Sequence, residues 1–167
     1  PKDSVICLMD IGNYITNLIF IINGQFYSMR DISVGMNTLW DGIQSEMGMS
    51  SDDLHNLMLG HISTINKDDL RNAVFSANLD LKVSLDTAFT YLETITEGQQ
   101  VDKIFMTGGG ALVPFMIDAI TENMGIDSEI INPFNKLDYE ESLFIDFTPE
   151  QIGSLYTVST GLAFRFE

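Results

Sequence analysis

The sequence has few basic residues, one cysteine, four prolines and no long hydrophobic run. Eight Lys and Arg face 24 Asp and Glu over 167 residues, which gives a formal net charge of −16. Such a chain is a poor candidate for a nucleic-acid binder, because affinity for phosphate backbones comes mainly from Lys and Arg. It also lacks the basic cluster that holds a protein to an anionic membrane. The longest apolar stretch, residues 18–22, is far shorter than the roughly 20 residues that span a bilayer.

The single cysteine, Cys7, cannot form an intramolecular disulfide, and no Cys/His spacing suits a structural zinc. No signal peptide is visible, and the chain runs from Pro1 almost directly into an apolar segment without an initiator Met. We therefore expect a domain of a longer cytosolic protein. Hydrophobic residues make up 45% of the chain and charged residues 19%, which predicts a folded domain and not a disordered acidic tail.

The first 32 residues read as three strands in a meander. Residues 5–9 form a continuous apolar run, which is typical of a strand covered on both faces. Residues 16–22 and 25–30 are the next two strand-like runs, and Asn23-Gly24 separates them. This pair predicts a β-hairpin, because both residues tolerate the positive φ of a type I′ turn.

A mainly helical region follows. Apolar residues at helical spacing predict a first helix that Gly48 ends: Met36, Leu39, Trp40, Ile43 and Met47. Ser50 and Asp53 have the spacing of a capping box, so a short helix should begin there and stop at Gly60. Residues 66–98 predict either one long helix or two helices with a break near Asn78.

The last third of the chain alternates strands and helices. We expect strands at 103–106 and 128–131, a helix at 114–124, a solvated loop at 135–150 and a final helix from about 151 to 165. With the first three strands, this order predicts an α/β fold: a mixed five-stranded sheet with helices on both sides. Residues 1–49 and 99–167 would form its core, and residues 50–98 a helical insert that makes a small second lobe.

The segment Asp10–Thr16 joins the first two predicted strands. A glycine such as Gly12 lets a phosphate approach bare backbone N–H groups. Asp10 could hold Mg²⁺ through water, since this ion prefers carboxylates and phosphate oxygens, and Thr16 could add a hydroxyl. The alternative is an ordinary hairpin turn that Asp10 caps and in which Gly12 only permits a positive φ.

A second glycine turn, Thr107–Ala111, lies between a predicted strand and a predicted helix. Three consecutive glycines, Gly108 to Gly110, are conformationally costly and need a reason. One reason is that a flat base or ribose can lie against a backbone without side chains. The other is simply a tight strand-to-helix turn. Neither the dinucleotide G-x-G-x-x-G pattern nor a phosphate-binding G-K-[ST] loop is present.

Taken together, the two turns resemble those of the actin-like ATPase superfamily, with its RNase H-like fold. The chain is similar to the second lobe of that fold and, within it, to the type IV pilus assembly PilM family. Related cell-division actin homologues (FtsA) and secretion-system L proteins remain alternatives. Besides the two turns, the matching stretches are Asn23-Gly24, Arg30 to Gly35, residues 132–134 and residues 160–165.

This resemblance implies ATP and Mg²⁺ as ligands. It places Asp10, Gly12, Asn13 and Thr16 on a phosphate-binding turn, with Asp10 reaching the metal through water, and Gly108, Gly109, Gly110 and Ala111 on an adenosine-binding turn. In this family the nucleotide lies between two lobes. The other lobe, which carries the first phosphate loop, is not within these 167 residues.

The chain departs from the family at the ribose site. Where the family usually has a Glu and a Lys on the short helix, this sequence has His55 and Met58. Hydrogen bonds to charged groups contribute roughly 1.5–3 kcal/mol each. Because about 1.4 kcal/mol is a factor of ten, losing two of them predicts nucleotide affinity lower by about a hundredfold or more.

No catalytic residue set emerges, and we expect little or no catalysis from this chain. His55 and His61 read as ordinary surface or partly buried residues. The resemblance implies a cytoplasmic scaffold at the inner membrane of a bacterium, within the platform of the type IV pilus. There a PilN-like tail would bind the missing first lobe, beside other platform proteins. The alternatives are an active Mg-ATPase and a filament-forming, FtsA-like actin homologue.

Overall fold

The computed structural model describes residues 4–58, 65–140, 142 and 144–165. The expected helix stop at Gly60 and the residue His61 lie outside the described residues. The short helix that carries His55 and Met58 is described, but not these two side chains.

Five strands form one mixed sheet in the order β3-β2-β1-β4-β5. The strands are β1 (Val5–Ile11), β2 (Thr16–Ile22), β3 (Gln25–Ile32), β4 (Lys103–Thr107) and β5 (Ser128–Ile130). The pairs β1–β2 and β2–β3 are antiparallel, whereas β1–β4 and β4–β5 are parallel. The predicted fold class is therefore confirmed, and β1 is the central strand that joins the antiparallel and parallel halves.

The hairpin between β2 and β3 turns at Asn23-Gly24, as predicted. Asn23 has φ 56° and Gly24 has φ 80°, the positive values that a type I′ turn requires. The predicted capping box is also present at the start of the short helix. The amide N of Asp53 donates to Ser50 Oγ at 3.2 Å, and the amide N of Ser50 donates to Asp53 Oδ2 at 2.8 Å.

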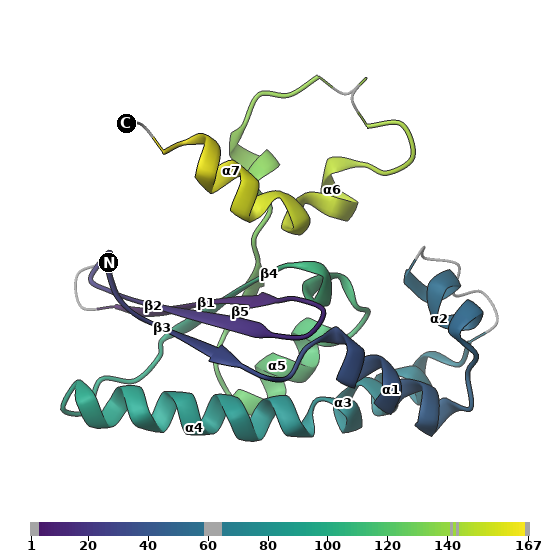
Figure 1. Ribbon diagram of the computed structural model, residues 1–167, viewed down its shortest axis with the longest axis horizontal. Coiled ribbons are helices and arrows are strands. Elements are labelled where there is room, and N and C mark those ends of the chain that lie inside the picture. The colour runs from purple at the N-terminus through teal and green to yellow at the C-terminus, as the bar shows by residue number, and fades with distance from the viewer. Residues whose placement is uncertain (1–3, 59–64, 141, 143, 166–167) are drawn as a thin grey trace.

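Helices lie on both sides of the sheet (Figure 1). The long helices are α1 (Met36–Met47), α3 (Lys67–Ala77), α4 (Leu79–Ile95) and α5 (Met116–Met124), and the shorter ones are α2 (Ser51–Met58), α6 (Pro149–Ile152) and α7 (Thr157–Ala163). Helices α1, α3, α4 and α5 cover one face, whereas α6 and α7 stand over the other (Figure 1). Short 3₁₀ turns η1 (Gly109–Leu112), η2 (Pro133–Lys136) and η4 (Gly153–Tyr156) connect them.

The main core lies between the sheet and the four long helices. Alternate residues of β1 are buried, namely Val5, Cys7, Met9 and Ile11, while those between them are half-buried. The hydrophobic cluster includes residues of α3 and α4, so these helices share one core with the sheet. The division into a sheet core and a separate helical insert stays a prediction. None of the described helices is long and apolar enough to cross a membrane.

Of the two alternatives for residues 66–98, the structure has the two-helix form. The break falls at Asn78, between α3 and α4. Asn78 is buried, and both its backbone N and its side-chain Nδ2 donate to the carbonyl of Val74, at 3.2 and 2.8 Å. The short polar side chain competes with the next helical turn for this carbonyl, which favours a change of direction there.

The prediction of one final helix from 151 to 165 is wrong. The segment is α6, then the 3₁₀ turn η4, then α7. A Cβ atom at Gly153 would collide with the side chain of Asn132, so this glycine brings the turn against the end of β5. Asn132 Nδ2 also donates to the carbonyl of Pro149 at 3.0 Å. Contacts with a distant segment therefore break the helix.

The predicted solvated loop at 135–150 carries many exposed residues but also has an aromatic anchor. The Phe134 ring lies 5.2–5.4 Å from the rings of Tyr139, Phe144 and Tyr156, all edge-on. Such edge-to-face pairs stabilise the arrangement beyond the area that they bury. Two residues of the loop, Tyr139 and Phe144, are therefore packed on η2, which in turn contacts η4 through Tyr156.

Candidate functional site

The turn between β1 and β2 is packed on the start of α1. The carbonyl oxygens of Gly12 and Asn13 accept hydrogen bonds from the amides of Met36 and Asn37, both at 2.9 Å. A Cβ at Gly35 would lie 2.6 Å from the Asn13 oxygen, so only glycine permits this approach. The first amides of α1 are thus already used by the turn and are not free for a phosphate.

The amide of Gly12 is also occupied, since it donates to the carbonyl of Ile15 at 3.0 Å. In the described part of the chain, the amides of Asn13, Tyr14 and Ile15 donate no hydrogen bond. All three residues are exposed. The N–H groups that this turn can offer to an anion are therefore those of the three residues after Gly12.

Thr16 lies inside the protein. It has no exposed surface, and its Oγ1 donates to the carbonyl of Val34 at 2.7 Å. This bond ties the start of β2 to the segment before α1. The hydroxyl predicted to reach a ligand thus supports the turn in this structure.

Asp10 is the penultimate residue of β1 and is half-buried. Burial raises the pKa of its carboxyl above the ordinary value. A nearby cation would offset this penalty, because an opposite charge favours the ionised form. No group of three or more His, Cys, Asp or Glu gathers around a metal-sized site among the described residues. Asp10 is therefore a single carboxylate, which suits an ion that keeps most of its waters.

The second glycine turn lies directly beside the first. Strand β4 pairs with β1, with Asp10 opposite Thr107. A Cβ at Gly108 would collide with Asp10 Oδ1 and lie 2.8 Å from the Ile11 carbonyl oxygen, and φ of Gly108 is +81°. A Cβ at Gly110 would collide with the Ile11 side chain. Two of the three glycines are thus required by the close approach of the two turns.

The third glycine is different. A Cβ at Gly109 would find its nearest neighbour, a methyl carbon of Leu155, at 3.9 Å. Gly109 is half-buried and Ala111 is buried. Gly109 therefore leaves open backbone at the place where the sequence suggested that a base or ribose could lie.

Two residues that the sequence did not suggest, Ser154 and Leu155, contact the second glycine turn. The carbonyl of Ser154 accepts hydrogen bonds from Thr107 Oγ1 at 2.7 Å and from the Gly108 amide at 3.3 Å. The neighbouring Leu155, half exposed, borders Gly109. No local signal marks these residues, because their role depends on a chain reversal some 46 residues after the turn.

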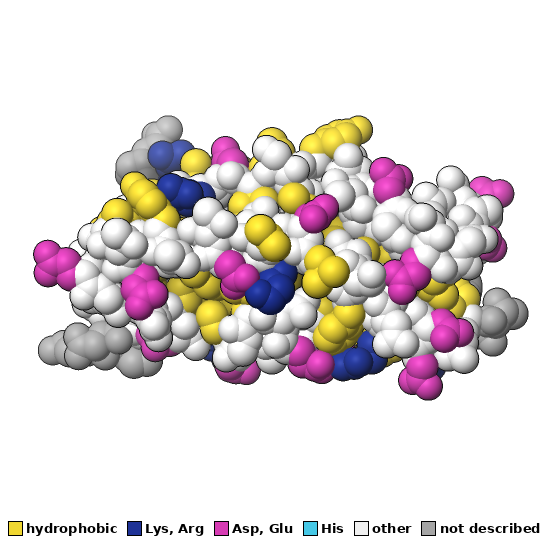
Figure 2. Space-filling model, turned by 90° about the horizontal axis from the view of Figure 1, so that it is seen from below, with side chains coloured by type: hydrophobic (Ala, Val, Ile, Leu, Met, Phe, Trp, Pro, Cys, Tyr) yellow, Lys and Arg dark blue, Asp and Glu magenta, His cyan; other side chains and the backbone are white. Residues whose placement is uncertain are grey.

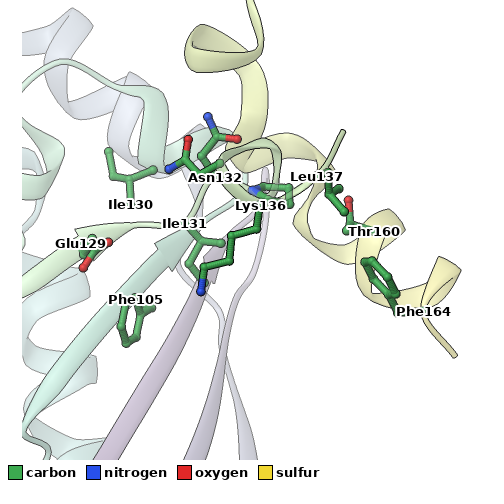
Figure 3. Close-up of a pocket in the computed structure, with 11 residues that line it drawn as sticks. Phe105, Glu129, Ile130, Ile131, Asn132, Lys136, Leu137, Thr160 and Phe164 are labelled. Atoms are coloured by element: carbon green, nitrogen blue, oxygen red, sulfur yellow. The ribbon is translucent and has the colours of Figure 1, made fainter. Parts of the chain in front are cut away.

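The cavities found among the described residues give the two turns little enclosed space. The cavity lined by Gly109, Leu112, Val113 and Pro114 has a volume of about 50 Å³, room for only one or two waters. The largest described cavity, about 510 Å³, lies between the sheet and α7 (Figure 3). Phe105, Ile131 and Lys136 are among its lining residues, and no residue of either turn is. The turns by themselves therefore enclose no nucleotide-sized space.

Comparison with solved structures defines the class first. The mixed sheet and its flanking helices form the actin-like ATPase fold, shared with MreB5 of Spiroplasma citri bound to ADP (TM-score 0.60, 16% identity, 96% of this chain and 52% of that chain). A ParM mutant described as pCBH, non-polymerisable, also matches (TM-score 0.56, 13% identity, 98% and 48%). At these identities the likeness shows the fold alone.

The sequence then identifies the family. Residues 1–167 match the family described as type IV pilus assembly protein PilM, and the chain belongs to it. The structure of a PilM-PilN type IV pilus biogenesis complex matches with a TM-score of 0.74 and 17% identity over 97% of this chain. The chain spans 46% of the length of that matched chain. Among curated proteins, no sequence relative matches the chain.

Proposed function

We propose that the chain is one lobe of a type IV pilus scaffold in which the two glycine turns face a nucleotide shared with a second lobe. Family membership supports the pilus role, and the 46% coverage of the matched PilM chain supports the second lobe. The protein would act in the cytoplasm, at the inner membrane. A PilN-like tail would bind the other lobe, as the PilM-PilN complex suggests by analogy, beside other platform proteins.

The observation that carries the nucleotide proposal is the close approach of the two turns at Asp10 and Gly108. At the ends of the neighbouring strands β1 and β4, this approach brings together the half-buried carboxylate of Asp10 and the open backbone of Gly109. Burial raises the pKa of the Asp10 carboxyl. Mg²⁺-ATP fits this set of groups: Asp10 would hold the ion through water, the exposed amides near Asn13 would face phosphate, and Gly109 with Leu155 would face the nucleoside. The bound ion supplies charge neutralisation for the phosphates.

In this proposal, nucleotide binding favours a closed arrangement of the two lobes, and turnover is not required. A ligand shifts such an equilibrium only by its differential affinity for the two states. The small cavity at Gly109 supports a shared site, because this chain alone encloses too little space for a base. His55 and Met58, in place of the family's charged pair, favour weak binding over fast catalysis.

Thermal unfolding of the complete two-lobe protein with and without Mg²⁺-ATP tests this proposal. At a ligand concentration of 100 times the dissociation constant, stabilisation should be about 2.7 kcal/mol. Asp10→Asn should reduce this ligand-dependent shift by more than half. Asp146→Asn, the same change at an exposed carboxylate, should leave it intact. No shift at millimolar ATP would refute nucleotide binding while leaving the family assignment in place.

The same samples separate the two alternatives. Steady phosphate release that Asp10→Asn abolishes would indicate an active Mg-ATPase. Nucleotide-dependent pelleting would indicate a filament-forming homologue. Binding with neither activity is the result expected for a scaffold.

A further inference from the structure

Helix α4 carries an apolar surface that is largely exposed in the described chain. Its residues at four-residue spacing, Leu79, Val83, Thr87, Tyr91 and Ile95, are all exposed, and we call them the α4 stripe. The four apolar members are 55%, 64%, 48% and 40% exposed. The opposite side of the helix packs in the core through Leu81, Leu85, Ala88 and Leu92, so the stripe is not needed to hold α4 on the sheet.

The geometry of the stripe suits another helix. Side chains four residues apart form a ridge along a helix, and interdigitation of two such ridges is the commonest mode of helix packing. From Leu79 to Ile95 the ridge is about 24 Å long at roughly 1.5 Å per residue. Arg30 of the edge strand β3 lies over the Tyr91 ring at 3.9 Å, so this part of the ridge borders the edge of the sheet.

The charges around the stripe select the partner. Asp80, Asp86, Glu93 and Glu97 lie on or directly after α4. Of the cations beside them, Lys82 is paired with Asp86 and Arg30 lies over the Tyr91 ring. Figure 2 shows this helical face: apolar side chains are spread across it, carboxylates surround them, and cations are few. A basic partner is attracted to such a surface, whereas an anionic membrane is repelled. A second copy of the chain, with its own net charge of −16, is also disfavoured.

We propose that the α4 stripe is a docking site for a basic amphipathic helix of another protein. Apolar side chains of that helix would lie between Leu79, Val83 and Tyr91, and its Lys or Arg residues would face the carboxylates along α4. The stripe lies on the opposite side of the sheet from α7 (Figure 1) and does not include the glycine turns. This proposal is therefore independent of nucleotide binding and of the proposed PilN contact.

The test uses a fluorescent, blocked peptide of about 18 residues, roughly 27 Å as a helix, with Leu on one face and Lys elsewhere. A second peptide has Glu in place of every Lys. Fluorescence anisotropy is measured against the chain and two variants, Val83→Glu and Val158→Glu. Val158, on α7, is 57% exposed, so it is a matched valine on the other side of the molecule.

The sign of the Val83→Glu effect separates the two ways in which a basic peptide can bind. Non-specific attraction to an acidic protein would strengthen when a further carboxylate is added. Docking on the stripe predicts the opposite, a loss of roughly tenfold or more in affinity for Val83→Glu, about 1.4 kcal/mol. Val158→Glu should change affinity less than twofold, and the Glu peptide should not bind.

Equal or tighter binding to Val83→Glu would overturn the proposal, as would the absence of saturable binding of the Lys peptide. Two other results would assign the stripe to a different occupant and equally refute the basic helix. One is a dimer of the chain, by sedimentation, that Val83→Glu dissociates. The other is Val83-dependent binding to phosphatidylserine vesicles. Thermal unfolding of both variants checks that the fold is retained.

Discussion

The two glycine turns are similar in composition, but different parts of the chain hold them in place. The first turn, between β1 and β2, rests on residues that follow it closely: Gly12 and Asn13 accept from the start of α1, and Thr16 donates to Val34. The second turn depends on the distant Ser154, which accepts from Thr107 and Gly108. The partners of the first turn therefore lie 18 to 24 residues along the chain, whereas the partner of the second lies 47 residues away, beyond α5 and β5.

This difference has a consequence for function. A ligand at Gly109, as proposed, would also meet Leu155, which belongs to the segment 149–163 that is hydrogen-bonded to this turn through Ser154. That segment stands over the less covered face of the sheet (Figure 1). Ordering of this segment and ligand binding at Gly109 should therefore be coupled, whereas binding at the first turn should not depend on it.

The largest expected effect comes from the contact between the turns. Gly108→Ala forces a Cβ into Asp10 and Ile11 at a φ of +81°, so overpacking and backbone strain combine. We expect a loss of about 3 kcal/mol, which corresponds to a fall in Tm of roughly 6–12 °C for a domain of this size. Gly109→Ala is the matched control, because its Cβ has space, and it should unfold within about 2 °C of the wild type. Similar melting of the two variants would contradict the described approach of the turns.

Two buried threonines sharpen the comparison. Thr16 and Thr107 each donate to a carbonyl at 2.7 Å, the first to Val34 and the second to Ser154. Thr16→Val leaves the Val34 carbonyl without this donor, and we expect a global loss of about 1–3 kcal/mol. Thr107→Val should cost less, about 1 kcal/mol, since the Ser154 carbonyl keeps Gly108 and Thr157 as donors.

Native-state hydrogen exchange distinguishes the two threonine variants. Thr107→Val should speed exchange mainly in residues 149–163, whereas Thr16→Val should speed it through the sheet. Identical patterns of exchange would mean that the two turns are not held separately.

A smaller effect concerns Asp10 without ligand. Because burial raises its carboxyl pKa in the folded state, the fold disfavours the ionised form. The resulting penalty is present above the folded pKa and disappears as the pH falls below the unfolded value. Asp10→Asn should therefore stabilise the ligand-free chain at pH 7, by less than about 0.5 kcal/mol after solvent screening. A denaturant titration measures this gain, and a loss of stability would mean that the carboxylate has a favourable partner.

The smallest effect is expected at the start of α2. Hydrogen bonds from Ser50 lower the pKa of the exposed Asp53 carboxyl below its ordinary value of 3.8. The hydrogen-bonded Asp53 carboxylate therefore stabilises α2 at pH values above 3.8. This stabilisation is lost as the pH falls through the lowered pKa of Asp53 in the folded state. The protection of the amides in residues 51–57, measured against their intrinsic exchange rates, should fall as the pH drops from about 4 to about 2. In Asp53→Asn this acid-dependent loss of protection should be much smaller, and a loss of the same size would contradict the assignment.

Where sequence prediction succeeded, the decisive contacts are local. Asn23-Gly24 and the Ser50–Asp53 box act within a few residues, so residue type alone specifies their geometry. For residues 66–98 the sequence left open one long helix or two helices with a break near Asn78. The choice depends on the tertiary contacts around Asn78, which the apolar spacing does not show. The roles of the two turns in binding remain predictions.

Where prediction failed, the decisive contacts are distant in sequence. Residues 151–165 have helical periodicity, yet Gly153 and Ser154 form a 3₁₀ turn because Asn132 and Thr107 approach them there. The sequence also did not show that the amides at the start of α1 are used by the first turn, because those partners lie 24 residues away.

By itself, the sequence determined the class of fold, the meander, the positions of the glycine turns and a net charge of −16, which disfavours binding to nucleic-acid phosphates. These properties follow from composition, periodicity and turn chemistry, which act over short distances. The tertiary structure alone decided that Gly108 and Gly110 are required by the neighbouring turn, that Thr16 points inward and that α4 presents an apolar stripe to solvent. Each of these depends on which segments pack together, and close packing of distant segments is a property of the whole chain.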